Sequence, residues 1–185
     1  MPKVGQTLIN KDSGDIFEFI ETGESTNGER VKLKITLNSK GRTVDDHIHL
    51  EQDETFEVLS GALTYFLNDE THHITAGETV MLPRKVAHNH YNTSDEPLTY
   101  YQTITPAFDV DYFIENLSGL INDDKLKNGK LPFLQAMVTG KYLESPSRLA
   151  SIPLGVQNVL INVLGPTARL FGYRALYKKY TGIEK

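Results

Sequence analysis

The sequence predicts a mainly β fold of the sandwich or barrel class, followed by an α-helical extension. Short runs of alternating apolar and polar residues recur up to Thr105, with turn signals at roughly 8–12-residue spacing, as in all-β sandwiches and barrels. Beyond Pro106 the apolar residues change to helical spacing. The 185 residues suffice for about one domain with an appendage. We therefore predict a β-barrel over residues 1–108 and helices over residues 109–185.

Alternation defines the predicted strands. In residues 30–37 every second residue from Val31 to Leu37 is apolar, which is typical of a half-buried strand with one wet face. Turn-forming clusters separate the other apolar runs, residues 23–28 form a loop, and Gly61 is expected at a corner or bulge. The strands predicted in this way are residues 6–10, 15–21, 30–37, 56–59, 62–67, 71–75, 79–82, 88–92 and 98–105.

The extension contains four predicted helices, separated by turn and loop signals. Pro132 is expected in the first turn of the second helix and Gly140 beyond its end. Gly165 and Pro166 are expected to break or kink the chain between the last two helices. Residues 122–130 are polar and are predicted to form a loop. The predicted helices are residues 109–120, 131–139, 153–164 and 166–180.

Composition and charge exclude several classes of function. The chain has no cysteine, so it has no disulfide, no thiolate metal site and no catalytic thiol. A net charge of −5 argues against a nucleic-acid partner, which would favour a basic face. Residues 1–108 carry 9 Lys and Arg against 17 Asp and Glu, a net charge of −8, whereas residues 109–185 carry 10 against 7, a net charge of +3. The first residues lack the apolar segment of a secretion signal, and we expect a cytoplasmic protein.

Residues 41–61 bring His47, His49 and Glu54 close together in the sequence. In an extended strand alternate side chains share a face, so His47 and His49 are expected to point the same way. After a turn at residues 51–53, a second strand beginning near Glu54 is expected to return antiparallel and to bring its carboxylate to the same side. Two neutral imidazoles and a carboxylate that converge form a divalent-metal site, and His88 is a suitable fourth ligand further along the chain.

The spacing of these residues resembles two conserved motifs of the cupin superfamily. The first motif matches at Gly41, His47, His49, Glu54 and Gly61, and the second at Gly77, Pro83, His88 and Asn92. The resemblance implies a cupin-type double-stranded β-helix, that is, a jelly-roll barrel, in which His47, His49, Glu54 and His88 bind a divalent metal. One position departs from the motif, because Lys85 stands where glycine is usual. If that turn needs a positive φ, the lysine costs about 1 kcal/mol, and its side chain becomes a candidate for the pocket rim.

Three nitrogen donors and one oxygen donor suit Fe, Mn, Ni, Zn or Cu, and affinity order alone does not choose among them. Four protein ligands on an octahedral ion leave two positions for substrate or O₂. The alternative is a set of ordinary surface side chains in a β domain.

Other polar and aromatic residues of the predicted strands are candidates for the pocket. His90 and Asn92 share strand parity with His88, so they are expected to face the same interior. His90 is interpreted either as a catalytic base, alongside Glu54, or as a residue that only lines the pocket; Asn92 is interpreted as structural. His72 and His73 are expected in solvent. Five further residues lie on predicted strands, and some of them are expected to line the cavity, although the alternation of the strands does not decide which. They are Tyr65, Phe66, Tyr100, Tyr101 and Gln102.

Three functions remain open. The first is a metal-dependent enzyme acting on a small organic molecule, with a dioxygenase-type oxidoreductase favoured. The second is a metal-dependent isomerase or lyase, and the third is a non-catalytic small-molecule or metal-sensing module. Residues 152–171 are mostly apolar, with Arg169 as the only charge, although Gln157, Asn158 and Asn162 make the segment a poor membrane span. We weigh packing on the barrel or a partner subunit against peripheral membrane contact and a membrane span. A homodimer is expected, because exposed apolar helices would bury more surface by pairing.

Overall fold

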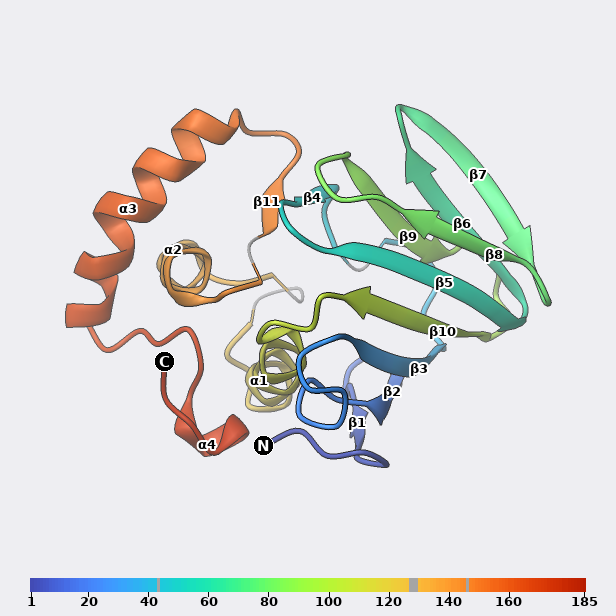
Figure 1. Ribbon diagram of the computed structural model, residues 1–185, viewed down its shortest axis with the longest axis horizontal. Coiled ribbons are helices and arrows are strands. Elements are labelled where there is room, and N and C mark those ends of the chain that lie inside the picture. The colour runs from blue at the N-terminus through green and yellow to red at the C-terminus, as the bar shows by residue number, and fades with distance from the viewer. Residues whose placement is uncertain (43, 127–129, 146) are drawn as a thin grey trace.

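Two antiparallel sheets and a group of helices make up the protein in the computed structural model, which describes all residues except 43, 127–129 and 146. The mainly β fold with a C-terminal helical extension is therefore confirmed (Figure 1). The first sheet has the order β1 (Thr7–Ile9), β2 (Ile16–Glu21), β3 (Val31–Leu37), β10 (Leu98–Thr105), β5 (Asp53–Ser60) and β8 (Thr79–Leu82). The second sheet has the order β11 (Ser147–Leu149), β4 (His47–His49), β9 (His88–Asn92), β6 (Ala62–Leu67) and β7 (Glu70–Thr75).

The alternating pattern of β3 places its apolar residues in the core. Val31, Leu33, Ile35 and Leu37 are buried, and the residues between them are partly exposed. β3 pairs with β10 in a register that sets Ile35 opposite Tyr100, which is also buried. Phe56 and Val58 of β5 and Leu63 of β6 complete this core, which lies between the two sheets.

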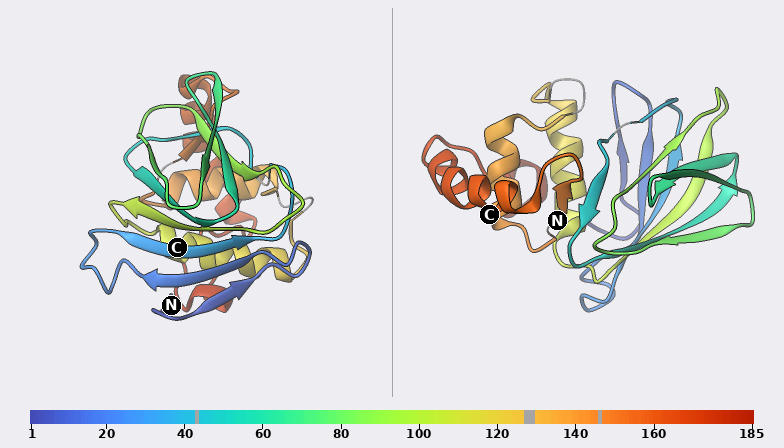
Figure 2. Two further views of the ribbon diagram at one scale, coloured as in Figure 1. Left: turned by 90° about the vertical axis from the view of Figure 1, so that its right-hand side faces the viewer. Right: turned by 90° about the horizontal axis from the view of Figure 1, so that it is seen from above.

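The helices gather on one side of the strands, with α1 lying between the strands and the pair α2 and α3 (Figures 1 and 2). Their bounds are α1 (Val110–Asn122), α2 (Phe133–Tyr142), α3 (Leu154–Leu170) and α4 (Lys178–Thr181). Residues 127–129, within the predicted loop 122–130, lie outside the described residues. Among the helices that are described, none combines the length and apolar character needed to cross a membrane.

The predicted break at Gly165 and Pro166 is wrong, because α3 runs through both residues to Leu170. A proline inside a helix costs about 3 kcal/mol, and here close packing of α3 on α2 offsets that cost. Gly165 serves this packing: a Cβ there would lie 2.8 Å from Cβ of Lys141 and 3.0 Å from the carbonyl oxygen of Met137. Gly140 likewise lies inside α2 rather than beyond its end, and the predicted fourth helix shortens to α4.

A strand that the sequence did not predict, β11, forms the edge of the second sheet. Its residues pair antiparallel with β4, and Ser147 lies opposite His49. Three residues are too few to show a periodicity, so no sequence signal identified this strand. Through β11 the helical part of the chain contacts the strand that carries two histidines.

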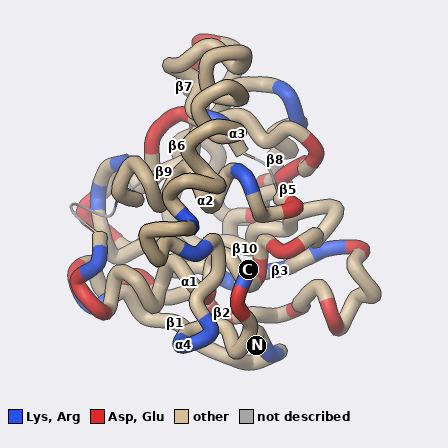
Figure 3. The backbone as a smooth tube through the Cα atoms, turned by 90° about the vertical axis from the view of Figure 1, so that its left-hand side faces the viewer, with Lys and Arg blue, Asp and Glu red and all other residues tan. Residues whose placement is uncertain are grey.

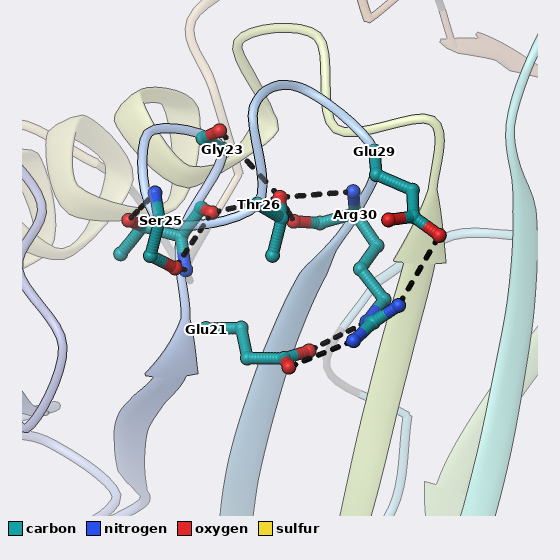
Figure 4. Close-up of polar contacts among 7 residues, drawn as sticks. Glu21, Gly23, Ser25, Thr26, Glu29 and Arg30 are labelled. Atoms are coloured by element: carbon teal, nitrogen blue, oxygen red, sulfur yellow. Dashed lines mark hydrogen bonds and ion pairs between the residues drawn. The ribbon is translucent and has the colours of Figure 1, made fainter.

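Residues 23–28 form the predicted loop between β2 and β3, and polar contacts hold it in place (Figure 4). The guanidinium of Arg30 donates two hydrogen bonds to the Glu21 carboxylate, at 2.6 and 2.9 Å. These bonds lower the pKa of Glu21. The Thr26 hydroxyl donates to the Arg30 carbonyl oxygen at 2.6 Å, and the Gly23 amide donates to Asp111 of α1 at 2.9 Å. The loop therefore links the first sheet to α1.

Candidate metal centre

Three histidines and a glutamate converge between the sheets. His47 and His49 come from β4, Glu54 from β5 and His88 from β9, and each offers a ligand atom within 4.8 Å of the others. His49 Nε2 lies 3.2 Å from Glu54 Oε1, and His88 Nε2 lies 3.5 Å from Glu54 Oε2. The centroids of the three imidazole rings are 4.8 to 5.4 Å apart. The structure thus brings together all four residues expected as metal ligands.

The route by which Glu54 reaches the cluster differs from the prediction. β4 and β5 do not form a hairpin; they lie in different sheets, so Glu54 approaches the histidines from the facing sheet. Gln52 lies buried between the two strands, and its amide donates hydrogen bonds to the carbonyl oxygens of Pro106 and Ala107 at 2.8 and 3.2 Å. These contacts fix the chain where it crosses between the sheets. His88 arrives from a neighbouring strand, directly opposite His47.

The polar atoms of the cluster fit a bound cation. His49 Nδ1 and Nε2, Glu54 Oε2 and His88 Nε2 are buried and have no hydrogen-bond partner. Such atoms are rare in folded proteins, because an unmet buried polar group costs about 1–3 kcal/mol. A divalent ion would satisfy several of them at once.

Groups around the cluster orient the ligand atoms. The Nδ1 atoms of His47 and His88 lie 2.9 Å from the backbone carbonyl oxygens of Asp45 and Val86. A carbonyl accepts only from N–H, so both rings carry their proton on Nδ1 and leave Nε2 free as a ligand. Gln102 donates to Glu54 Oε1 at 2.9 Å and fixes the carboxylate.

Burial and charge set the ionisation of the cluster. Burial lowers the pKa of His47. Burial also acts to lower the pKa of His49, but the facing Glu54 carboxylate outweighs it and raises that pKa. For Glu54, burial acts to raise the pKa, yet the charge of His49 and the nearby His88 hold it well below its usual range. Glu54 is therefore an ionised carboxylate at neutral pH, as a metal ligand must be.

His90 lies beside the cluster, against aromatic side chains. Its Nε2 is 3.1 Å from the Tyr100 hydroxyl, and its ring packs on Phe56 with centroids 4.5 Å apart. Burial lowers the pKa of His90 to about 4, so the ring is neutral at neutral pH. Burial also raises the pKa of Tyr100, which stays protonated. His90 Nδ1 is buried without a hydrogen-bond partner, so it is available to a ligand.

Lys85, which stands where the cupin motif usually has glycine, lies in a turn with a positive φ. Lys85 adopts a φ of 67°, and its amide donates to the carbonyl oxygen of His49 at 2.7 Å. The strained turn therefore supports the backbone of a candidate ligand. The Lys85 side chain is not among the described residues that line the cavity.

The remaining polar residues that the sequence singled out lie away from the four ligands. Asn92 is buried and bonds to Ser94 and to the carbonyl oxygen of Glu96. His72 stacks on Tyr65, and His73 bonds to Thr64.

A cavity of about 650 Å³ opens from the cluster. His47, His49, Glu54 and His90 line one part of it, and apolar residues from the first sheet and from α1 line much of the rest, together with polar and charged side chains such as Asp15 and Lys40. Of the strand residues proposed as lining, Tyr100 and Gln102 contact the cavity, while Tyr65, Phe66 and Tyr101 are not among the described lining residues. The contribution of α1 was missed, because helical spacing shows an apolar stripe but not what the stripe faces.

The fold and the cluster define a protein with two facing antiparallel sheets and a candidate metal centre between them. Residues 34–104 match the family model described as Cupin domain. This part of the chain, which carries all four candidate ligands, is therefore similar to a cupin domain.

Solved structures of low sequence identity resemble the chain, whereas no curated protein matches it. The structure of KdgF from Halomonas sp. is 13% identical over 57% of this chain and 92% of that chain, with a TM-score of 0.48. A sugar phosphate isomerase from Silicibacter pomeroyi is 21% identical over 56% of this chain and 75% of that chain, with a TM-score of 0.46. A predicted oxalate decarboxylase from Thermotoga maritima is 20% identical over 55% and 90%, with a TM-score of 0.46.

Proposed function

We propose that this protein is a divalent-metal-dependent enzyme acting on a small organic molecule, with a dioxygenase-type oxidoreductase as the favoured class. The observation that carries the proposal is the cluster of His47, His49, Glu54 and His88, which borders a cavity and contains buried nitrogen and oxygen atoms without a hydrogen-bond partner. A bound ion there would supply Lewis-acid chemistry or oxygen activation, since four protein ligands leave two positions of an octahedral ion open.

The chain's own residues supply orientation, a largely apolar surrounding and a site for a proton. Gln102 holds the Glu54 carboxylate, and apolar residues line much of the adjoining cavity. Proton handling falls to His90 or Glu54 in this proposal. His90 is neutral and presents its unpartnered Nδ1 in the interior, where this atom would form a hydrogen bond to a bound molecule. Its pKa of about 4 makes it a weak base, which favours positioning over full proton abstraction.

Metal analysis of protein purified without chelator tests the proposal. We expect about one divalent ion per chain in the wild type and a strong loss in His49→Ala, because one of four ligands is removed. His73→Ala is the matched control, since its imidazole bonds to Thr64 outside the cluster and its loss should leave metal content unchanged. Wild-type protein with no more metal than His49→Ala would overturn every metal-based mechanism. Iron or manganese would support oxygen chemistry, whereas zinc or nickel would favour an isomerase or lyase.

A further inference from the structure

Helix α1 buries polar residues on one side. Asp111, Glu115 and Asn116 are among its buried residues. Asp111 accepts a hydrogen bond from the Gly23 amide at 2.9 Å, and Glu115 accepts one from Gln6 at 2.7 Å. Asn116 accepts from the Tyr177 amide at 2.9 Å. These contacts join α1 to the N-terminal segment, to the loop after β2 and to the C-terminal segment, so they fix the rotation of the helix about its axis.

The apolar stripe of α1 faces the cavity as a result. Val110, Phe113, Ile114, Leu117 and Ile121 recur at helical spacing, and all five line the cavity. An amphipathic helix normally packs such a stripe against the core. Here all but Val110 are only half-buried, so the stripe borders open volume.

Another part of the lining is also apolar. Leu33 and Ile35 of β3 and Phe17 of β2 also line the cavity, and the metal cluster borders the same volume. A volume of about 650 Å³ lies within the range of roughly 300–1,000 Å³ that is usual for pockets that hold a small organic molecule. The cavity therefore joins an apolar chamber to a polar cluster.

The charged lining residues outside the cluster already have partners or face solvent. Lys40 and Arg42 form ion pairs at 2.9 and 2.8 Å, and Asp15 accepts hydrogen bonds from neighbouring serine and backbone groups. Asp12 is exposed. Among the described lining residues, the buried polar atoms without a hydrogen-bond partner belong to His49, Glu54, His90 and Gln52. These residues lie at or beside the cluster, which places the polar end of a ligand there.

We propose that the cavity binds an amphiphilic molecule, with an oxygen-bearing head such as a carboxylate at the cluster and a straight hydrocarbon chain along the apolar stripe of α1. This inference deepens the proposed function by naming a ligand class, and it rests on that function only for the head group. The chain contributes through burial, so each added methylene should tighten binding about fourfold until the chamber is full.

Calorimetric titration with saturated straight-chain carboxylates, from butanoate to decanoate, tests this inference on metal-loaded and on chelator-treated protein. We expect affinity to rise with chain length in both forms. Affinity that is independent of chain length would overturn the inference. The metal content of the same samples reports separately on the proposed function. Protein that holds no metal but still binds longer carboxylates more tightly would contradict only the enzyme proposal.

Two variants of one stripe residue locate the binding. Leu117→Gln should weaken decanoate binding at least about tenfold while metal content stays unchanged. Val159→Gln is the matched control, because Val159 is 64% exposed on α3 and should leave binding as in the wild type. Leu117→Phe adds volume without polar atoms and should stop the rise at a shorter chain. Wild-type length dependence in both Leu117 variants would place the binding elsewhere and overturn the inference.

Discussion

Adding one methyl group to each of two glycines of α3 should change stability in opposite directions. Gly165→Ala gains about 1 kcal/mol of helix propensity, but its Cβ would lie 2.8 and 3.0 Å from atoms of α2, well inside the optimal carbon separation of about 3.5–4.0 Å. Overpacking of this kind costs about 1–3 kcal/mol, and the backbone oxygen of Met137 cannot turn aside. We expect a net loss of about 1 kcal/mol. Gly155 has no heavy atom within 4 Å of the same position, so Gly155→Ala should gain about 0.5–1 kcal/mol.

Urea denaturation followed by far-ultraviolet circular dichroism measures both variants, because the signal reports the helices. The free energies of unfolding should differ by roughly 2 kcal/mol between the two variants, or about 4–8 °C in melting temperature for a chain of this size. Equal stabilisation by both changes would show that α3 does not pack closely on α2 and would refute the reasoning.

Three further predictions follow from named contacts. Asp109→Asn should cost about 1.5–3 kcal/mol, since the carboxylate accepts bonds from Glu144, Ser145 and Lys185. Burial acts to raise the pKa of Asp109, but these hydrogen bonds lower it. The stabilising effect of the carboxylate is therefore present above about pH 4 and is lost on further acidification. Urea titrations in which Asp109→Asn loses as much stability at low pH as at neutral pH would contradict this. Metal affinity, measured by chelator competition, should decrease as the pH is lowered, and the decrease should begin before the pH reaches about 6.5. The reason is that the raised pKa of His49 keeps a proton on this ligand. A metal affinity that stays unchanged down to about pH 5 would contradict this prediction. Light scattering should give twice the mass of one chain, because Val159, Leu170 and other apolar residues of α3 are exposed. Few charged residues lie on α3 to oppose pairing (Figure 3), and a monomer mass would refute the dimer.

Peripheral membrane contact through the C-terminal helices stays a prediction as well. Flotation with anionic liposomes at low salt tests it, because interfacial binding of a basic, apolar segment should be strongest there. Protein that does not move with the liposomes would remove the prediction.

Local patterns were sufficient for most of the fold. Strand β3 follows from strict alternation, and the four metal-ligand candidates follow from strand parity and spacing. Contacts between distant segments were not accessible in the same way. Parity placed His47 and His49 together but did not show that Glu54 reaches them from the other sheet. Helical spacing identified the stripe of α1, yet only the polar contacts of Asp111 and its neighbours decide that this stripe faces a cavity.

Gly165 illustrates the limit of local rules for helix ends. Glycine followed by proline ordinarily signals a stop, because neither residue favours a helix interior. In α3 the absence of a side chain at Gly165 lets two helices approach closely, and that packing outweighs the local preference. A glycine can therefore mark the end of a helix or allow close packing inside one, and which of the two applies depends on the neighbouring helix.

The position of β11 has a consequence for the order in which this molecule can assemble. Strand β4 pairs with β9 only between His47 and His88, and its other edge is completed by Ser147–Leu149. Because ribosomes synthesise proteins from the N-terminus, both histidines of β4 emerge long before the strand that covers them. A nascent or proteolytically shortened chain that stops before β11 would leave a bare strand edge beside the metal ligands, open to pairing with other chains. Loss of bound metal would then indicate that the C-terminal part of the chain, including β11, is missing.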